Sequence, residues 1–333
     1  MSFQCVKKYE DSYDKYVLLA TSGKIVLPDY LDKESKKLAE TVIKKNKFTA
    51  KASEKISMTL VSKKKVMDFI IVGLGENKKL DAKNIRQYLF DGLKNITGKV
   101  FVSFDDKDLD NMDIIAEVVE HINYKFDKYF SKKKEEFLEV SYLTDKKVPK
   151  LIEGYELAKI SNIVKDLVNE QAEVLNPKEL ADRATKLGKE FGFEVEILDE
   201  KKAQKLGMTA YLAVARAAHH RPYVIVMRYK GDAKSKYTYG LVGKGLTYDT
   251  GGLSLKPTES MLTMRCDMGG AATMIGAMCS IAKMKLKKNV TCVVAACENS
   301  IGPNAYRPGD ILTAMNGKTI EVTNTDAEGR LTL

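Results

Sequence analysis

The chain has 333 residues, of which 44% are hydrophobic and 30% charged, so it is long enough for two globular domains with ordinary cores. No apolar run approaches the roughly 20 residues that a membrane span needs, and charged residues follow Met1 where a signal peptide would have its apolar segment. The five cysteines are odd in number and form no CxxC pair, a pattern typical of reduced thiols. We therefore expect a cytoplasmic protein with no membrane partner.

The formal net charge of +10 permits an acidic partner such as nucleic acid. The lysines, however, lie in short scattered runs with carboxylates nearby, which favours an ordinary solvated surface. Only three histidines occur, so HExxH metal sites are excluded. Two of them, His219 and His220, are adjacent, and neighbouring side chains of an extended segment point to opposite sides. We expect a solvated loop there rather than a pair of metal ligands.

Residues 1–150 are predicted to form a smaller N-terminal α/β domain. Apolar runs indicate strands at residues 16–19, 24–28, 56–61, 69–72 and 100–104, with helical periods at 31–45, 82–95 and 112–130. Gly73-Leu74-Gly75 follows one of these strands, but the third glycine of a dinucleotide-binding GxGxxG is missing. A glycine turn that leaves a strand is the better interpretation, and this half offers no catalytic constellation.

Residues 151–168 are predicted to be a connecting helix, and residues 169–333 a second domain. Asn176 is a plausible N-cap with Pro177 in the first helical position, and Asn316-Gly317 predicts a type I′ hairpin. Strands are expected at 193–198, 223–229, 239–248 and 289–297, and helices at 177–191, 200–206 and 269–284. This alternation predicts an α/β/α domain with a mostly parallel mixed sheet, in which sites lie beyond the carboxyl ends of the strands.

Three runs near the end of the chain carry carboxylates among small or apolar residues: 242–257, 264–271 and 324–331. Their four carboxylates belong to Asp249, Asp267, Asp326 and Glu328, and such groups hold divalent cations when histidine is absent. Any one of these aspartates alone could be a cap or a turn residue. Four of them together with two lysines and an arginine indicate a metal site.

The basic residues of these runs have several possible roles. Lys244 lies between two glycines in a strand expected to be buried, where a lowered pKa would leave a neutral amine able to bind a metal; the alternative is a lysine that reaches solvent. Lys256 could remain charged and stabilise an oxyanion. Arg330 could bind a carboxylate or another anion through its forked guanidinium.

The three runs resemble the motifs of the leucyl (cytosol) aminopeptidase family of two-metal exopeptidases. The resemblance lies in Gly243-Lys244-Gly245 with Asp249-Thr250-Gly251-Gly252 and Lys256-Pro257, in Asp267-Met268-Gly269-Gly270-Ala271-Ala272, and in the octapeptide Asn324-Thr325-Asp326-Ala327-Glu328-Gly329-Arg330-Leu331. It covers residues 151–333 in order, whereas the first half resembles the family's smaller domain loosely. The implied activity is hydrolysis of the N-terminal residue, leucine or another bulky apolar one, from peptides.

The resemblance implies a ligand set for two divalent ions, Zn²⁺ or Mn²⁺. Asp249 and Glu328 would bridge the ions, Lys244 and Asp267 would complete the shell of one, and Asp326 that of the other. Asp267 with its ion would also receive the free α-amino group of the substrate.

The remaining implied roles concern substrate and assembly. Lys256 would hold the carbonyl oxygen of the tetrahedral intermediate, Arg330 would hold a bicarbonate that acts as general base, and Met264 would line the first side-chain pocket. A homohexamer is the implied assembly. The family's catalytic domain continues beyond the octapeptide, so we expect this chain to stop within that domain. The alternatives are a DNA-binding regulator on an aminopeptidase scaffold and an inactive fragment.

Overall fold

The computed structural model describes residues 2–9, 12–23, 25–104, 114–133, 136–144 and 149–333. The chain divides into two compact units, Met1–Lys159 and Ile160–Leu333. The division falls inside one helix, α4, which spans Pro149–Asn169. Among the described helices, none combines the length and the apolarity that crossing a membrane requires.

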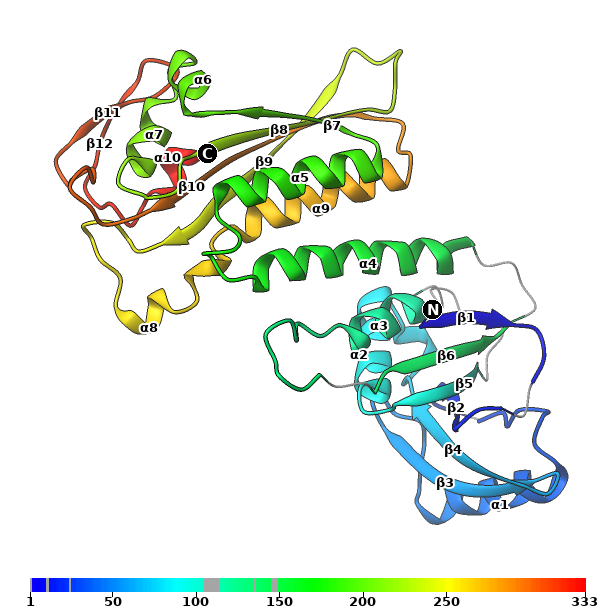
Figure 1. Ribbon diagram of the computed structural model, residues 1–333. Helices are drawn as coiled ribbons and strands as arrows, with labels where there is room; N and C mark the ends of the chain where they lie inside the picture. The colour runs from blue at the N-terminus through cyan, green and yellow to red at the C-terminus, as the bar shows by residue number, and fades with distance from the viewer. Residues whose placement is uncertain (1, 10–11, 24, 105–113, 134–135, 145–148) are drawn as a thin grey trace. The chain divides into compact units, whose positions relative to one another are not determined.

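The first unit is built on a six-stranded sheet in the order β1-β6-β5-β2-β4-β3, parallel throughout except for the edge pair β3–β4 (Figure 1). Its strands are β1 Phe3–Val6, β2 Lys15–Ala20, β3 Lys55–Ser62, β4 Lys65–Gly73, β5 Gly98–Phe104 and β6 Leu138–Leu143; its helices are α1 Lys33–Lys45, η1 Asn77–Lys79, α2 Ala82–Leu93 and α3 Ile114–Asn123.

Strand β2 is buried on both faces of this sheet, as expected of a central parallel strand. Val17 and Leu19 pack into the core beneath α2 and α3, whereas Tyr16 and Leu18 pack into the core on the side of α1. Alternate side chains of one short strand thus serve two cores.

Two predictions for this unit are wrong. Residues 25–28 form no strand; Leu27 is buried, so the apolar pattern there reflects packing without sheet pairing. The predicted helix 112–130 ends earlier, at Asn123, because the Asn123 side chain binds both the N–H and the C=O of Leu138, at 2.9 and 2.8 Å, where β6 begins. The first two residues of that predicted helix lie outside the described residues.

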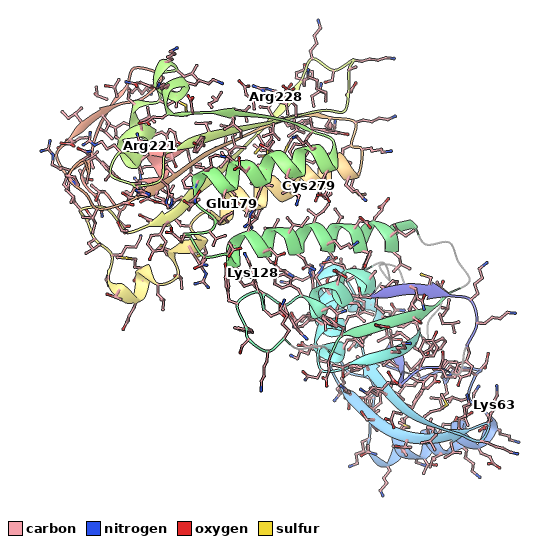
Figure 2. The ribbon with its side chains drawn as sticks, viewed as in Figure 1. Lys63, Lys128, Glu179, Arg221, Arg228 and Cys279 are labelled. Carbon is pink, nitrogen blue, oxygen red and sulfur yellow. The ribbon has the colours of Figure 1, made fainter. Side chains whose placement is uncertain are left out.

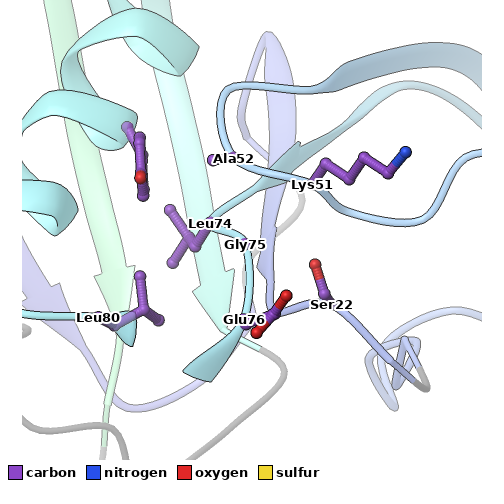
Figure 3. Close-up of a pocket in the computed structure, with 8 residues that line it drawn as sticks. Ser22, Lys51, Ala52, Leu74, Gly75, Glu76 and Leu80 are labelled. Atoms are coloured by element: carbon purple, nitrogen blue, oxygen red, sulfur yellow. The ribbon is translucent and has the colours of Figure 1, made fainter. Parts of the chain in front are cut away.

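Leu74 and Gly75 of the Gly73-Leu74-Gly75 turn line a hollow of about 190 Å³ together with Ser22, Lys51, Leu80 and Tyr88 (Figure 3). The backbone N–H groups of the turn are already used: Leu74 donates to the Ala20 carbonyl at 2.8 Å and Gly75 to the Ala50 carbonyl at 3.0 Å. These N–H groups therefore cannot cradle a phosphate. A Cβ on Gly73 would lie 2.2 Å from the Lys51 carbonyl oxygen, so close packing of the backbone explains that glycine.

The second unit has a four-stranded sheet in the order β7-β8-β10-β9 (Figure 1). Asn176 caps α5 through the Glu179 N–H, with Pro177 in the first turn, as predicted. The strands are β7 Glu194–Leu198, β8 Tyr223–Lys230, β9 Thr238–Asp249 and β10 Asn289–Asn299, with a separate hairpin of β11 Ile311–Thr313 and β12 Thr319–Glu321; the helices are α5 Pro177–Phe191, α6 Glu200–Lys205, α7 Thr209–Ala215, α8 Thr258–Met261, η2 Met264–Cys266, α9 Gly269–Lys283 and α10 Gly329–Thr332.

The α/β class and the mixed sheets are confirmed, but parallel pairing does not dominate this sheet. Of its three pairings, only β9–β10 is parallel, and β7–β8 and β8–β10 are antiparallel. The alternation of strands and helices wrongly predicted mostly parallel pairing. A helix rises about 1.5 Å per residue, so α6 and α7 are too short to carry the chain back along the length of β7. Arg228 of β8 reaches Glu196 of β7 at 2.9 Å across this antiparallel pair (Figure 2).

The hairpin predicted at Asn316-Gly317 is confirmed by the antiparallel pair β11–β12, but its predicted turn type, I′, is wrong. Only Gly317 has a positive φ, 80°, and its N–H closes a turn on the Ala314 carbonyl at 2.9 Å. A turn with both central residues left-handed lies instead between β3 and β4, at Lys63 and Lys64, with φ values of 51° and 68°. Asp32 supports it, since its carboxylate accepts the Lys63 N–H at 2.8 Å.

Replacing Lys64 with glycine is expected to raise the free energy of unfolding by about 0.5–1 kcal/mol. The left-handed conformation costs a lysine about 1–2 kcal/mol, which outweighs the larger backbone entropy that glycine loses on folding. Urea unfolding checks this against Lys65→Gly, one residue into β4, which should lower stability. Equal losses in both variants would contradict the strain at Lys64.

Candidate metal centre

The site lies where two parallel strands of the second unit end side by side. Asp249 is the last residue of β9 and Asn299 the last of β10, and the two are paired in register. Asp267 lies between η2 and α9, two residues before the helix begins. Asp326 and Glu328 lie between β12 and α10. Three segments distant in sequence thus deliver carboxylates to one place.

Two lysines link the four carboxylates in pairs. Lys244 Nζ lies 2.9 Å from Asp267 Oδ2 and 2.7 Å from Glu328 Oε1. Lys256 Nζ lies 3.1 Å from Asp249 Oδ2 and also contacts Asp326 Oδ1. Six of the eight site residues named from the sequence therefore form one cluster.

The net charge and the donor atoms of the cluster both suit the binding of cations. Four carboxylates and two ammonium groups give a formal charge of −4 + 2 = −2. Ligand atoms of Asp249, Asp326 and Glu328 lie within 4.8 Å of one another, and Asp249 and Glu328 are each only 1% exposed. Glu328 Oε2 is buried with no hydrogen-bond partner among the described residues. Hard oxygen donors, buried negative charge and an unused lone pair fit divalent cations.

Burial raises the pKa of two carboxyl groups of the cluster, those of Glu328 and Asp267. It raises the pKa of Glu328, and the Asp249 charge adds to that effect, although hydrogen bonding to Lys244 opposes it. Burial also raises the pKa of Asp267 against the lowering effect of Lys244. Buried carboxylates without enough counter-charge are held less easily as anions, and a bound cation would supply that charge.

The expectation of a lowered Lys244 pKa is wrong for this arrangement. Burial does lower the pKa, but the hydrogen bonds and charges of Asp267 and Glu328 outweigh it and raise the pKa above its usual value. The Lys256 pKa is likewise raised, because Asp326 and Asp249 outweigh burial. Without a bound cation, these carboxylates favour the ammonium form of both amines, and each amine then supplies positive charge between two carboxylates.

The side chains of the other two predicted site residues, Arg330 and Met264, form no ion pair or hydrogen bond with the cluster among the described residues. Arg330 is exposed on α10, and no ion pair joins it to another described residue. Met264 is half-buried at the start of η2, where its carbonyl accepts the Asp267 N–H at 3.2 Å. Of the two adjacent histidines, His219 is exposed and His220 is hydrogen-bonded to Glu298 at 2.9 Å.

Glycines bring Lys244 and Asp267 together. A Cβ on Gly243 would lie 2.9 Å from Ala271 Cα, and one on Gly270 would lie 3.0 Å from the Lys244 backbone nitrogen. Strand β9 and the first turn of α9 therefore approach more closely than side chains would allow. This contact places the Lys244 side chain beside the residue that precedes α9.

The sequence analysis missed two residues whose hydrogen bonds hold the segments that carry the predicted metal ligands. Asn299 and Thr325 bind the segments that carry Asp249 and Asp326, and both are fully buried. The available signal was a polar Glu298-Asn299 pair at the carboxyl end of an apolar strand, next to the strand that carries Asp249.

Comparison with known proteins agrees with this fold. Residues 162–333 match the model of the cytosol aminopeptidase family catalytic domain, and residues 17–133 that of the family's N-terminal domain. Over all 333 residues the chain is 92% identical to a probable cytosol aminopeptidase of Fusobacterium nucleatum, of which it spans 70%. It is 40% identical to one of Clostridium perfringens over 87% of this chain and 62% of that protein.

Solved structures give the same result. The bottromycin maturation enzyme BotP in complex with Mn superposes with a TM-score of 0.81 at 26% identity, over 96% of this chain and 67% of that one. The cytosol aminopeptidase of Coxiella burnetii gives a TM-score of 0.79 at 27% identity, over 99% and 68%. The fold is that of a peptidase with two α/β domains. This chain belongs to the cytosol aminopeptidase family, as its motifs indicated.

Replacing Gly243 with alanine is expected to lower the free energy of unfolding by about 1–3 kcal/mol, because the methyl group would force β9 and α9 apart. The matched control is Gly240→Ala in the same strand, where an added Cβ meets nothing within 4 Å and the change should stay within about 0.5 kcal/mol. Denaturant unfolding of both variants checks this. A Gly243→Ala protein as stable as the control would show that the close approach is unimportant.

Proposed function

We propose that this protein is an aminopeptidase that binds two divalent cations, Zn²⁺ or Mn²⁺, and releases N-terminal leucine or another bulky apolar residue from peptides. The observation that carries the proposal is the group of Asp249, Asp326 and Glu328, of which Asp249 and Glu328 are buried and Asp326 is half-buried, and whose donor atoms converge within 4.8 Å. Asp267 and Lys244 extend this group to the five residues that would hold the cations, with Asp249 and Glu328 between them; Lys244 would lose its proton on binding, since a metal ligand must be deprotonated. The structural relative BotP was solved in complex with Mn, which is consistent with such a centre.

Bound divalent cations would supply an activated water and polarise the scissile carbonyl. The chain's own residues position and stabilise the reacting groups. Lys256 is 15% exposed, and its raised pKa keeps it protonated. A fixed ammonium at the cluster can donate to the oxyanion that forms as the carbonyl is attacked.

The free amino group of the substrate gives the exopeptidase preference in this proposal. Asp267 lies at the edge of the cluster with its side chain 19% exposed, so its carboxylate can accept a hydrogen bond from an incoming amine. Arg330 is the residue we assign to a bicarbonate that takes up a proton, since its exposed guanidinium is free of ion pairs among the described residues. Met264, one turn before Asp267, would contact the first side chain.

We place the protein in the cytoplasm as a homohexamer, on the strength of the family to which it belongs. Peptides with a free N-terminus are the partners that this function requires.

Leucine p-nitroanilide, with its N-acetylated form as the blocked substrate, tests the reaction. We expect the metal-loaded protein to cleave only the free amine, a chelator to abolish cleavage, and Mn²⁺ or Zn²⁺ to restore it. Cleavage of both substrates, or of neither, would contradict the proposal.

Asp249→Ala should lower kcat/KM by more than about a hundredfold, since even the loss of outer partners of metal ligands costs about 10–100-fold. The control is Asp182→Ala, an aspartate of α5 that is 55% exposed and, among the described residues, paired only with Lys178 on its own helix. The control should retain wild-type turnover. Survival of turnover in Asp249→Ala would place the catalytic centre elsewhere.

A further inference from the structure

Asn299 contacts the metal centre from the interior of the second unit. It is the last residue of β10 and has no exposed surface. Its side-chain amide donates to Asp249 Oδ1 at 2.8 Å and to the Thr325 carbonyl at 3.0 Å. One amide thus joins the end of β9 to the segment that carries Asp326 and Glu328.

This contact decides which oxygen of Asp249 faces the cluster. Oδ1 accepts two hydrogen bonds, from Asn299 Nδ2 and from the Gly251 N–H at 2.9 Å. A carboxylate oxygen has about two lone-pair sites, so Oδ1 is saturated. Oδ2, which lies 3.1 Å from Lys256 Nζ, is the oxygen left for a cation.

The second hydrogen bond of Asn299 holds the other ligand-bearing segment. The Thr325 carbonyl also accepts from the Tyr306 hydroxyl at 2.6 Å. The Thr325 hydroxyl in turn donates to the Gly251 carbonyl at 2.7 Å. The segments that carry Asp249 and Asp326 are therefore locked together by neutral groups, independently of the two lysines.

The orientation of the amide is fixed by its partners. Both neighbours, a carboxylate and a carbonyl, are acceptors, so a flipped amide would set its oxygen against two oxygens. In the observed orientation Asn299 Oδ1 is buried with no hydrogen-bond partner among the described residues. Leaving a buried acceptor unpaired costs free energy, so this asparagine is poorly explained by folding alone.

We propose that Asn299 is a positioning residue of the metal centre, which saturates Oδ1 of Asp249 and thereby presents Oδ2 alone to the cations. The inference rests on the proposed function, because it assigns Asn299 a role toward the ions which that function requires. Residues that orient metal ligands typically change metal affinity about 10–100-fold when they are replaced.

Titration with Mn²⁺ alone, followed by electron paramagnetic resonance, tests the proposal without any substrate. We expect Asn299→Ala to weaken Mn²⁺ binding by about 10–100-fold. Asn299→Asp keeps the volume of the side chain but replaces the donor with an acceptor facing Asp249, so it should weaken binding at least as much. If Asn299→Ala does not fold, the Mn²⁺ affinity of Asn299→Asp tests the proposal in its place.

The matched control is Asn289→Ala, at the opposite end of the same strand. Asn289 also uses its amide to hold a loop, through the carbonyls of Asp232 and Ser235 at 2.8 and 3.2 Å. Its loss should affect thermal stability and leave Mn²⁺ affinity within about twofold of wild type, as for distant, independent sites.

Wild-type Mn²⁺ affinity in either folded Asn299 variant would overturn the inference, whatever its melting temperature, because Asn299 would then be structural only. Equal weakening in Asn289→Ala would overturn it too. A wild-type protein that binds no Mn²⁺ would instead overturn the metal centre of the proposed function, and the inference with it. The two failures are therefore distinguishable.

Discussion

The parallel pairing of β9 with β10 is the constraint on which the site depends. It brings Asp249 and Asn299 into register at the same end of the sheet, and the Asn299 amide then reaches across to Thr325. Without that pairing, the segment around Asp326 and Glu328 would lose its contact with Asn299 at the end of β10. Parallel strands end at a common edge, which is why such edges accumulate functional groups.

Charge balance explains how the fold tolerates a carboxylate-rich interior. Lys244 and Lys256 each lie between two carboxylates, and the attraction offsets part of the desolvation cost of burying these groups. The balance is incomplete, since Glu328 keeps one unpaired buried oxygen. The two lysines thus balance only part of the negative charge of the four carboxylates. The charge that remains could be balanced by a cation.

Local sequence patterns predicted the structure correctly where it depends on contacts between residues that are close in sequence. Asn176 and Pro177 start α5 as expected because capping involves only neighbouring residues. Predictions were wrong where the structure depends on contacts between residues that are distant in sequence. Lys63 and Lys64 adopt the left-handed turn that Asn316-Gly317 was expected to form, since pairing of β3 with β4 and the Asp32 carboxylate impose it. The strand directions in the sheet of the second unit were predicted wrongly for the same reason.

The sequence alone determined the donor set: four carboxylates, two lysines and an arginine in spaced motifs, and with them the family. These are properties of residue type and spacing, which folding does not alter. Only the tertiary structure decided the rest. It brought Asp267 and Glu328 to Lys244, and these carboxylates raise the pKa of an amine that was expected to be neutral. It also placed Asn299 behind Asp249, a role that depends on distance and orientation and leaves no motif in the chain.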